Sequence, residues 1–124
     1  MKNKSKLSKT SIGSKGEDLA CTYLIEKDYK ILERNWRFKK AEIDIIAKHN
    51  NCLIFIEVKA RSYTAFGQPE ESIDAKKEAM LIDAAQRYME SIDYNWEIRF
   101  DIISIILTKS LEIEKIDHFK DAFF

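Results

Sequence analysis

Apolar residues recur at helical spacing in two separate stretches of the chain. The first stretch follows Ser14-Lys15-Gly16-Glu17, which has the form of a capping box, and predicts a helix over about residues 14–28. The second predicts a long helix with its first turn at Pro69-Glu70-Glu71 and its end near Ser91. Its apolar stripe consists of Ile73, Met80, Leu81, Ala84, Ala85, Tyr88 and Ile92. Each helix therefore needs an apolar surface to cover.

Between the helices the hydrophobic period changes to two, which predicts strands over 30–38, 41–47 and 52–60. In the first strand Leu32, Trp36 and Phe38 share a face; in the second, Ala41, Ile43, Ile45 and Ala47; in the third, Cys52, Ile54, Ile56, Val58 and Ala60. After the second helix, 96–107 is β-branched and almost continuously apolar, as a buried central strand is, and 111–116 is its expected hairpin partner.

The element order is therefore α-β-β-β-α-β-β, an α/β fold with a mixed sheet flanked by helices. Consecutive hairpin strands pair antiparallel, whereas a crossover through the second helix returns the fourth strand parallel to the third. A chain of 124 residues has the length of one domain. We expect that domain to span 13–124, preceded by a flexible lysine-rich tail over 1–12.

Composition excludes several classes of protein. No apolar run approaches the roughly 20 residues that a membrane helix needs, and no apolar segment typical of a secretion signal follows the basic tail. Cys21 and Cys52 lack Cys-x-x-Cys spacing, so neither a zinc knuckle nor a disulfide framework is indicated. A cytoplasmic protein with no membrane partner is the expectation.

The net charge of zero is the sum of unlike parts. The chain has 21 basic and 21 acidic residues, but the first 15 residues hold five lysines and no acid. From Gly16 onward 16 basic residues face 21 acidic ones. Either this excess negative charge is scattered over the surface, or part of it is concentrated where a cation binds.

The predicted hairpin offers one such concentration. If Asn50-Asn51 is a two-residue turn, Asp44 lies opposite Glu57 and Glu42 opposite Lys59, all on one face. Opposed carboxylates roughly 5 Å apart repel each other unless a cation or proton separates them, and Mg²⁺ (or Mn²⁺) takes such oxygen ligands. Alternatively, these residues form a solvated face in which Glu42 pairs with Lys59.

Asp44, twelve intervening residues and then Glu57-Val58-Lys59 resemble the PD-(D/E)XK nuclease signature. The whole chain resembles, more specifically, the YraN-like family of small bacterial proteins. The matching segments are Gly13-x-x-Gly16-Glu17, Arg34-Asn35, Glu42-Ile43-Asp44, Phe55-Ile56-Glu57-Val58-Lys59-x-Arg61, Phe66-Gly67, Lys76, Arg99-Phe100-Asp101 and His118. Ala41 stands where the family usually has Gly, a change that leaves every candidate chemical group in place.

The resemblance implies a restriction-endonuclease-like fold related to Holliday-junction resolvases, which act as homodimers. It also implies that Asp44 and Glu57 hold the metal, that Lys59 orients the attacking water and stabilises the phosphorane, and that Glu17 supplies a further carboxylate. For Glu17, the capping box with Ser14 is the competing interpretation. The implied reaction is phosphodiester hydrolysis in DNA, including branched DNA.

Basic residues interleave with aromatic ones around the first strand and after the motif strand, a mixture used for backbone contacts and base stacking. Arg34, Arg37 and Arg61 are the candidates there, and Lys76 near the second helix is a candidate phosphate contact. A strand with core aromatics and solvated cations explains the same pattern. The alternative to a nuclease is thus a noncatalytic nucleic-acid or protein-binding module that keeps the fold.

Overall fold

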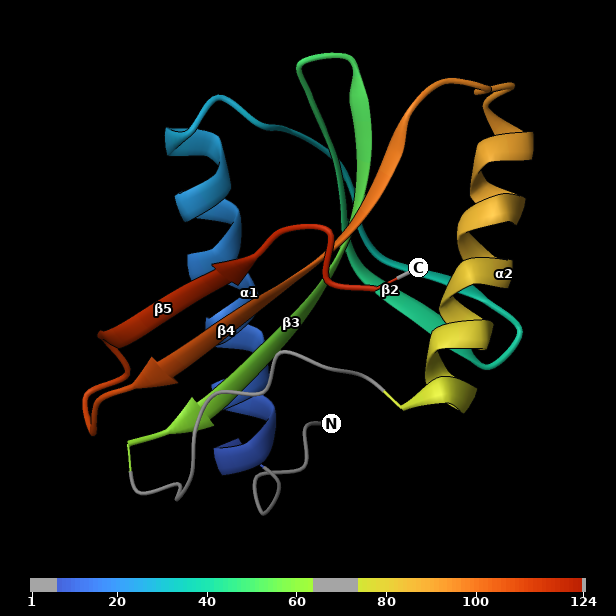
Figure 1. Cartoon of the computed structure of the whole chain (residues 1–124). Helices are drawn as coiled ribbons and strands as arrows, with labels where there is room; N and C mark the ends of the chain where they lie inside the picture. Colours follow the sequence, from blue (N-terminus) through green and yellow to red (C-terminus); the bar gives the residue numbers. More distant parts are fainter. Residues whose placement is uncertain (1–6, 64–73, 124) are drawn as a thin grey trace.

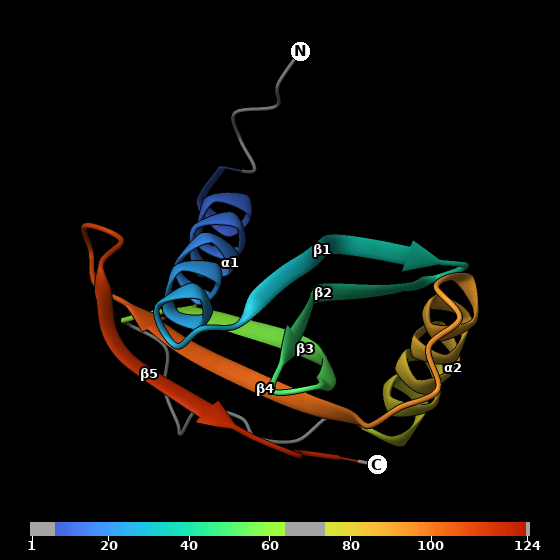
Figure 2. The same ribbon diagram turned by 90° about the horizontal axis from the view of Figure 1, so that it is seen from above.

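The computed structural model describes residues 7–63 and 74–123. The elements are α1 (Leu7–Glu26), β1 (Lys30–Phe38), β2 (Ala41–His49), β3 (Cys52–Ser62), α2 (Ala75–Ser91), β4 (Ile98–Leu107) and β5 (Ile113–Phe119). This order confirms the predicted α-β-β-β-α-β-β succession. The five strands form one sheet in the order β1-β2-β3-β4-β5, with the two helices on opposite sides of it (Figure 1, Figure 2).

The sheet is mixed, as predicted. β1, β2 and β3 pair antiparallel, β3 and β4 pair parallel, and β5 returns antiparallel along β4. The face covered by α1 is filled by Ile45, Ala47, Ile54, Ile56, Ile103, Ile105 and Leu107. The face covered by α2 is filled by Ala41, Ile43, Ile46, Leu53, Phe55 and Phe100. β3 and β4 are therefore apolar on both faces, as the centre of an α/β sheet requires.

The β2–β3 turn has the length predicted from sequence. Asn50 and Asn51 have φ angles of 49° and 65°, the left-handed conformation that a two-residue hairpin turn demands. Five successive pairs follow, from His49–Cys52 to Ile45–Ile56. Turn length thus fixes the register that was predicted.

The β2–β3 ladder stops at Ile45–Ile56, one pair short of Asp44 and Glu57. Beyond this point β2 continues only with β1, and Figure 2 shows these two strands running away from β3 toward α2. The prediction that Ala41, Ile43, Ile45 and Ala47 share one face is therefore wrong. Ala41 and Ile43 pack on the α2 side and Ile45 and Ala47 on the α1 side, because the strand bends between them.

α1 begins at Leu7, not near residue 14, so residues 7–12 of the predicted flexible tail are helical. Ser14 and Glu17 consequently lie inside the helix, and the capping-box interpretation is wrong. Gly16 has a different role: an ideal Cβ there would come within 2.4 Å of the Cβ of Ala60. The missing side chain lets α1 lie directly against β3.

α2 is capped by Asp74, whose side chain accepts a hydrogen bond from the Lys77 backbone N–H over 2.9 Å. It ends at Ser91, as predicted. The expected first turn at Pro69-Glu70-Glu71 and the motif Phe66-Gly67 lie outside the described residues. Neither α1 nor α2 combines the length and the apolar character needed to cross a membrane.

Candidate active site

Asp44 lies where β2 separates from β3. Its Oδ2 atom accepts a hydrogen bond of 2.8 Å from the backbone N–H of Val58. A strand partner would normally supply the acceptor for this N–H, so the carboxylate replaces a backbone carbonyl at the point where the ladder ends. The side chain is thereby held near Glu57, the residue that precedes Val58 in β3.

Glu57 is buried, with 9% of its surface exposed, and its charge acts on Asp44. The pKa of Asp44 is raised to about 8, first by burial and second by the charge of Glu57. The Val58 hydrogen bond lowers it, but Glu17 and Glu42 add further negative charge. Two carboxylates held this close require a proton or a cation between them.

Both carboxylates line one cavity of about 400 Å³ between the β1–β2 turn and the start of α2. Its wall also includes Glu42, Asp74, Lys76 and Lys77. The structure therefore brings together three of the four charges predicted to share a face, Glu42, Asp44 and Glu57. Lys59, the fourth, is not among the lining residues, although strand alternation places it on the same side of β3 as Glu57.

Lys77 is the site residue that the sequence interpretation missed. Its Nζ atom donates to Glu57 Oε2 over 2.6 Å. Burial opposes the charged form of Lys77, but the hydrogen bond to Glu57 outweighs it, and the pKa of Lys77 is raised. A signal was present: Lys77 precedes Leu81, Ala84 and Tyr88 at helical spacing, so this exposed cation continues the line of the apolar stripe of α2.

Glu17 contacts β1. Its Oε1 atom accepts a 3.0 Å hydrogen bond from Asn35 Nδ2 and lies 3.6 Å from Arg34 Nη2. Arg34 also donates to Asp18 over 2.9 Å. Glu17 is near enough to influence the pKa of Asp44, yet it does not line the cavity. The structure thus places Arg34 in a surface ion-pair group with α1.

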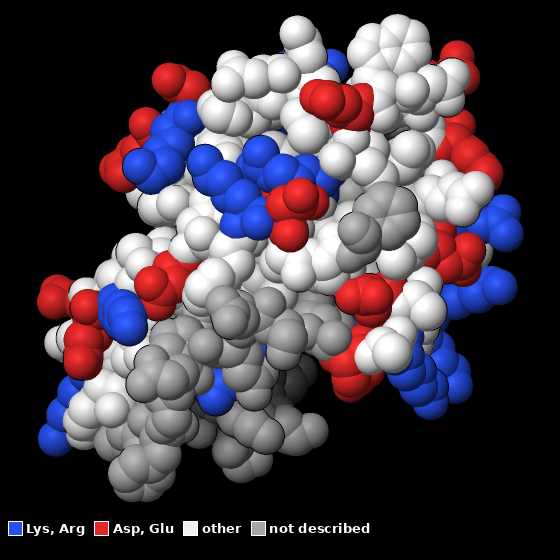
Figure 3. Space-filling view, viewed as in Figure 1, with Lys and Arg blue, Asp and Glu red and all other residues white. Residues whose placement is uncertain are grey.

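The other predicted nucleic-acid contacts are separated from one another. Lys76 lines the cavity of Asp44 and Glu57. Arg37 lies on β1 with 74% of its side chain exposed, 3.6 Å from Glu42 Oε1, and Arg61 lies at the far end of β3. Figure 3 shows basic and acidic side chains interspersed over one face of the molecule, including the part formed by α2.

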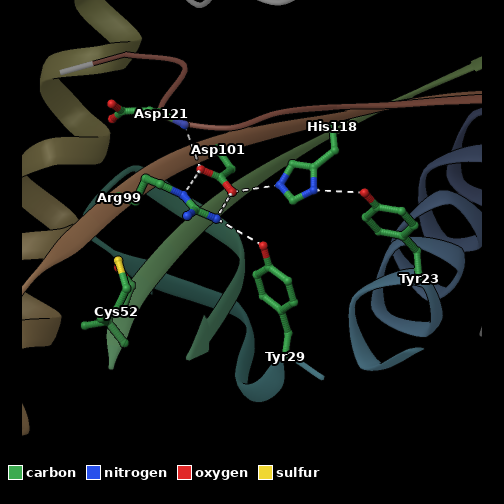
Figure 4. Close-up of polar contacts among 8 residues, drawn as sticks. Tyr23, Tyr29, Cys52, Arg99, Asp101, His118 and Asp121 are labelled. Carbon is green, nitrogen blue, oxygen red and sulfur yellow. Dashed lines mark hydrogen bonds and ion pairs between the residues drawn. The ribbon is translucent and has the colours of Figure 1, made fainter. Parts of the chain in front are cut away.

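A second polar cluster lies on the α1 side of the sheet (Figure 4). Asp101 is fully buried and accepts hydrogen bonds from Arg99, from His118 Nε2 over 2.7 Å and from the Asp121 backbone. His118 Nδ1 meets the Tyr23 hydroxyl at 3.0 Å. Burial disfavours the ionised carboxylate, but these donors outweigh it and lower the pKa of Asp101. The cluster ties α1, β4 and β5 together, with Arg99 and Asp101 as a structural pair on β4.

Comparison with known proteins places the chain in a family. Residues 16–105 match the model described as "Uncharacterised protein family UPF0102". The chain belongs to the UPF0102 family. A UPF0102 protein of Christiangramia forsetii is 49% identical over 113 residues, which is 91% of this chain and 93% of that protein. A UPF0102 protein of Caldanaerobacter subterraneus is 42% identical over 120 residues, 95% and 98% of the two chains. The YraN-like resemblance is thus confirmed.

The donor set of this UPF0102 chain fits a hard divalent cation. In the described residues no cluster of three or more His, Cys, Asp or Glu side chains could enclose a metal. Two carboxylates on neighbouring strands are nevertheless what Mg²⁺ commonly takes from a protein, with water and substrate phosphate as the remaining ligands. The raised pKa of Asp44 is the electrostatic sign that positive charge is favoured here.

Proposed function

We propose that this UPF0102 protein is a metal-dependent nuclease of the PD-(D/E)XK type that hydrolyses phosphodiester bonds in DNA, including branched DNA. The observation that carries the proposal is the position of Asp44 and Glu57. Both carboxylates line one cavity at the point where β2 leaves β3. The same α-β-β-β-α-β-β order with a mixed sheet supports the restriction-endonuclease-like assignment.

Asp44 and Glu57 would hold Mg²⁺ or Mn²⁺. Such a cation lowers the pKa of a bound water and neutralises charge on the phosphate. Asp44 is held in place by the Val58 N–H, and Glu57 by Lys77. Lys76 and Lys77 line the cavity and so supply positive charge for a phosphate group that enters it.

Lys59, on β3, keeps the proposed role of orienting the attacking water. Lys77 lines the cavity, and is therefore better placed to contact a phosphate there. Because Lys77 contacts Glu57 Oε2, a bound cation would compete with this ammonium group for the carboxylate, and Lys77 would then be available to substrate phosphate. Glu17 acts at longer range on Asp44 through its charge. The homodimer and the contacts of Arg34, Arg37 and Arg61 with nucleic acid stay predictions.

A noncatalytic binding module is the second candidate. It is favoured by the acidic excess from Gly16 onward, which opposes strong binding to a polyanion. It is also favoured by the ion pairs of Arg34 with Asp18 and of Arg37 with Glu42, since these cations are already engaged with carboxylates. Such a module would keep the fold and the carboxylate pair without turnover.

Calorimetric titration with Mg²⁺ and Mn²⁺ tests the metal site directly. We expect heat of binding for the wild type, loss of that heat in Asp44→Asn and Glu57→Gln, and no change in Glu90→Gln. Glu90 is an exposed control that pairs with Arg87 outside the cavity. Equal, negligible heats for all four proteins would refute the metal site.

Cleavage assays then separate the two candidates. Single-stranded, duplex, flap and four-way DNA are incubated with protein and Mn²⁺, with matching RNA strands beside them. A nuclease should cleave at least one substrate, and the two site variants should lose roughly 10³-fold in rate, as expected when several kcal/mol of transition-state stabilisation disappear. Gel shifts without any cleavage would instead indicate a nucleic-acid-binding module, whereas neither cleavage nor a shift would indicate a protein-binding one.

A further inference from the structure

A second cavity, of about 480 Å³, opens beside the carboxylate cavity. It is lined by Phe38, Lys39, Lys40, Ala41, Met80 and Asp83. Lys40, Ala41 and Met80 also line the cavity of Asp44 and Glu57, so the two cavities adjoin each other between the β1–β2 turn and α2. A ligand with an anionic part and an apolar part could therefore span both.

The second cavity differs in character from the first. Phe38 and Met80 provide an apolar wall, and its exposed surface is almost entirely apolar. Three cations surround this wall: Lys39 and Lys40 form the turn, and Arg87 lies over the Phe38 ring at 5.2 Å. The Nζ atom of Lys39 lies 5.3 Å from the centre of the same ring. Because both cations lie over the ring, a flat, apolar base would stack on Phe38 by displacing one of them, and the displaced cation would then be available to the attached phosphate backbone.

We propose that this cavity, the Phe38–Met80 pocket, binds one unstacked nucleobase of the nucleotide next to the phosphate in the carboxylate cavity. The inference rests on the proposed action on nucleic acid and defines which substrates suit it. The volume lies within the range of roughly 300–1,000 Å³ typical of small-molecule sites. Asp83 is the one carboxylate among the lining residues and can accept a hydrogen bond from a base amino group.

The pocket selects for local structure in the nucleic acid. A base inside a duplex must first unstack and unpair, which costs free energy. A base in a flap, bulge, junction or single strand has fewer stacking and pairing interactions to break, so its extrusion costs less. Stacking on an aromatic ring tightens binding by roughly 5- to 100-fold per base, which does not fully offset extrusion from an intact duplex. Unpaired nucleotides are therefore the preferred occupants.

A binding experiment with abasic oligonucleotides tests the pocket without any cleavage. Fluorescein-labelled hexamers of abasic deoxyribose spacers, with no base or with a single adenine, are titrated with protein in EDTA and followed by anisotropy. We expect the single base to tighten binding roughly 5- to 100-fold in the wild type. Phe38→Ala should abolish this gain, and Phe38→Trp, which keeps an aromatic face, should retain it. Ribose versions of both hexamers show whether RNA is bound equally.

Equal affinity for both hexamers in the wild type would overturn the pocket, and this comparison needs no variant to fold. Retention of the full gain in Phe38→Ala would overturn it as well. Failure of the nuclease proposal has a different signature: negligible metal heats and no cleavage, while the single-base gain persists. Metal binding and cleavage without any single-base gain in affinity would support the nuclease proposal and refute the base-binding pocket.

Discussion

Asp44 should make the metal-free protein less stable as the pH rises through neutrality. Its pKa is about 8 in the folded protein, compared with 3.8 as the ordinary value, because it is buried and lies near the charge of Glu57. Between these two values the folded protein holds a proton that the unfolded chain has lost. The free energy of unfolding therefore falls with increasing pH over this window and levels off above about pH 8.

The magnitude follows from the number of protons exchanged. One pKa unit corresponds to about 1.4 kcal/mol, so the contribution of Asp44 falls by roughly 4 kcal/mol between about pH 5 and pH 8. This is a large share of the roughly 5–15 kcal/mol that stabilises an ordinary domain. Asp44→Asn removes the titration but can still accept the Val58 hydrogen bond. The variant should thus match the wild type near pH 5 and exceed its stability increasingly above that.

Urea unfolding followed by tryptophan fluorescence, in EDTA and at each pH unit across this window, measures the effect. The control is Glu90→Gln, which removes one charge from an exposed side chain that pairs with Arg87 outside the cavity. That variant should run parallel to the wild type. If the Asp44→Asn curve also runs parallel to the wild type, Asp44 is ionised throughout, and the reasoning about a buried carboxylate pair is wrong.

Three further predictions have defined outcomes. In thermal melts, Gly16→Ala should destabilise the protein by about 1–3 kcal/mol because its new methyl group meets Ala60, and adding Ala60→Gly should restore the lost stability. Gly13→Ala, whose new methyl group would meet nothing within 4 Å, should stabilise α1 by about 0.5–1 kcal/mol. Asp101→Asn should lower the free energy of unfolding in urea by about 3–5 kcal/mol near neutral pH. Because folding lowers the pKa of Asp101, this difference should shrink below about pH 4. A variant as stable as the wild type would contradict the buried network. Lys77→Gln should tighten Mg²⁺ binding roughly 3- to 10-fold in calorimetry, since the cation no longer competes with an ammonium group for Glu57; weaker binding would show that Lys77 does not compete.

The sheet could be predicted because short-range rules determine it. The Asn50-Asn51 turn fixes the β2–β3 register, and alternation in β3 assigns Ile54 and Phe55 to opposite faces, as the structure confirms. The point where β2 leaves β3 could not be predicted in the same way. It depends on Asp44 replacing a backbone acceptor for Val58, which no periodicity expresses.

The helices show the same limit. The segment Ser14-Lys15-Gly16-Glu17 has the pattern of a helix start, yet it lies inside α1. The absence of a side chain at Gly16 allows α1 to approach Ala60, and such long-range packing leaves no local signal in the sequence. The sequence predicts the first turn of α2 at Pro69-Glu70-Glu71 and a phosphate contact at Lys76, whereas α2 begins at Ala75 with Asp74 as its cap. Both Lys76 and Lys77 line the cavity, but only the spacing of Lys77 from Leu81 and Ala84 points it toward the sheet.

The departures from local rules coincide in space, and this coincidence supports a functional site. A ladder ends early at Ile45–Ile56, a carboxylate with a raised pKa follows at Asp44, and a lysine stands on the apolar stripe of α2 opposite Glu57. The early end of the ladder and the raised pKa of Asp44 both cost stability, and a purely structural hairpin would need neither. An apolar pair at Asp44 and Glu57 would extend the core formed by Ile43 and Phe55. These charges are therefore consistent with the cation site that we propose, and the fold alone does not require them.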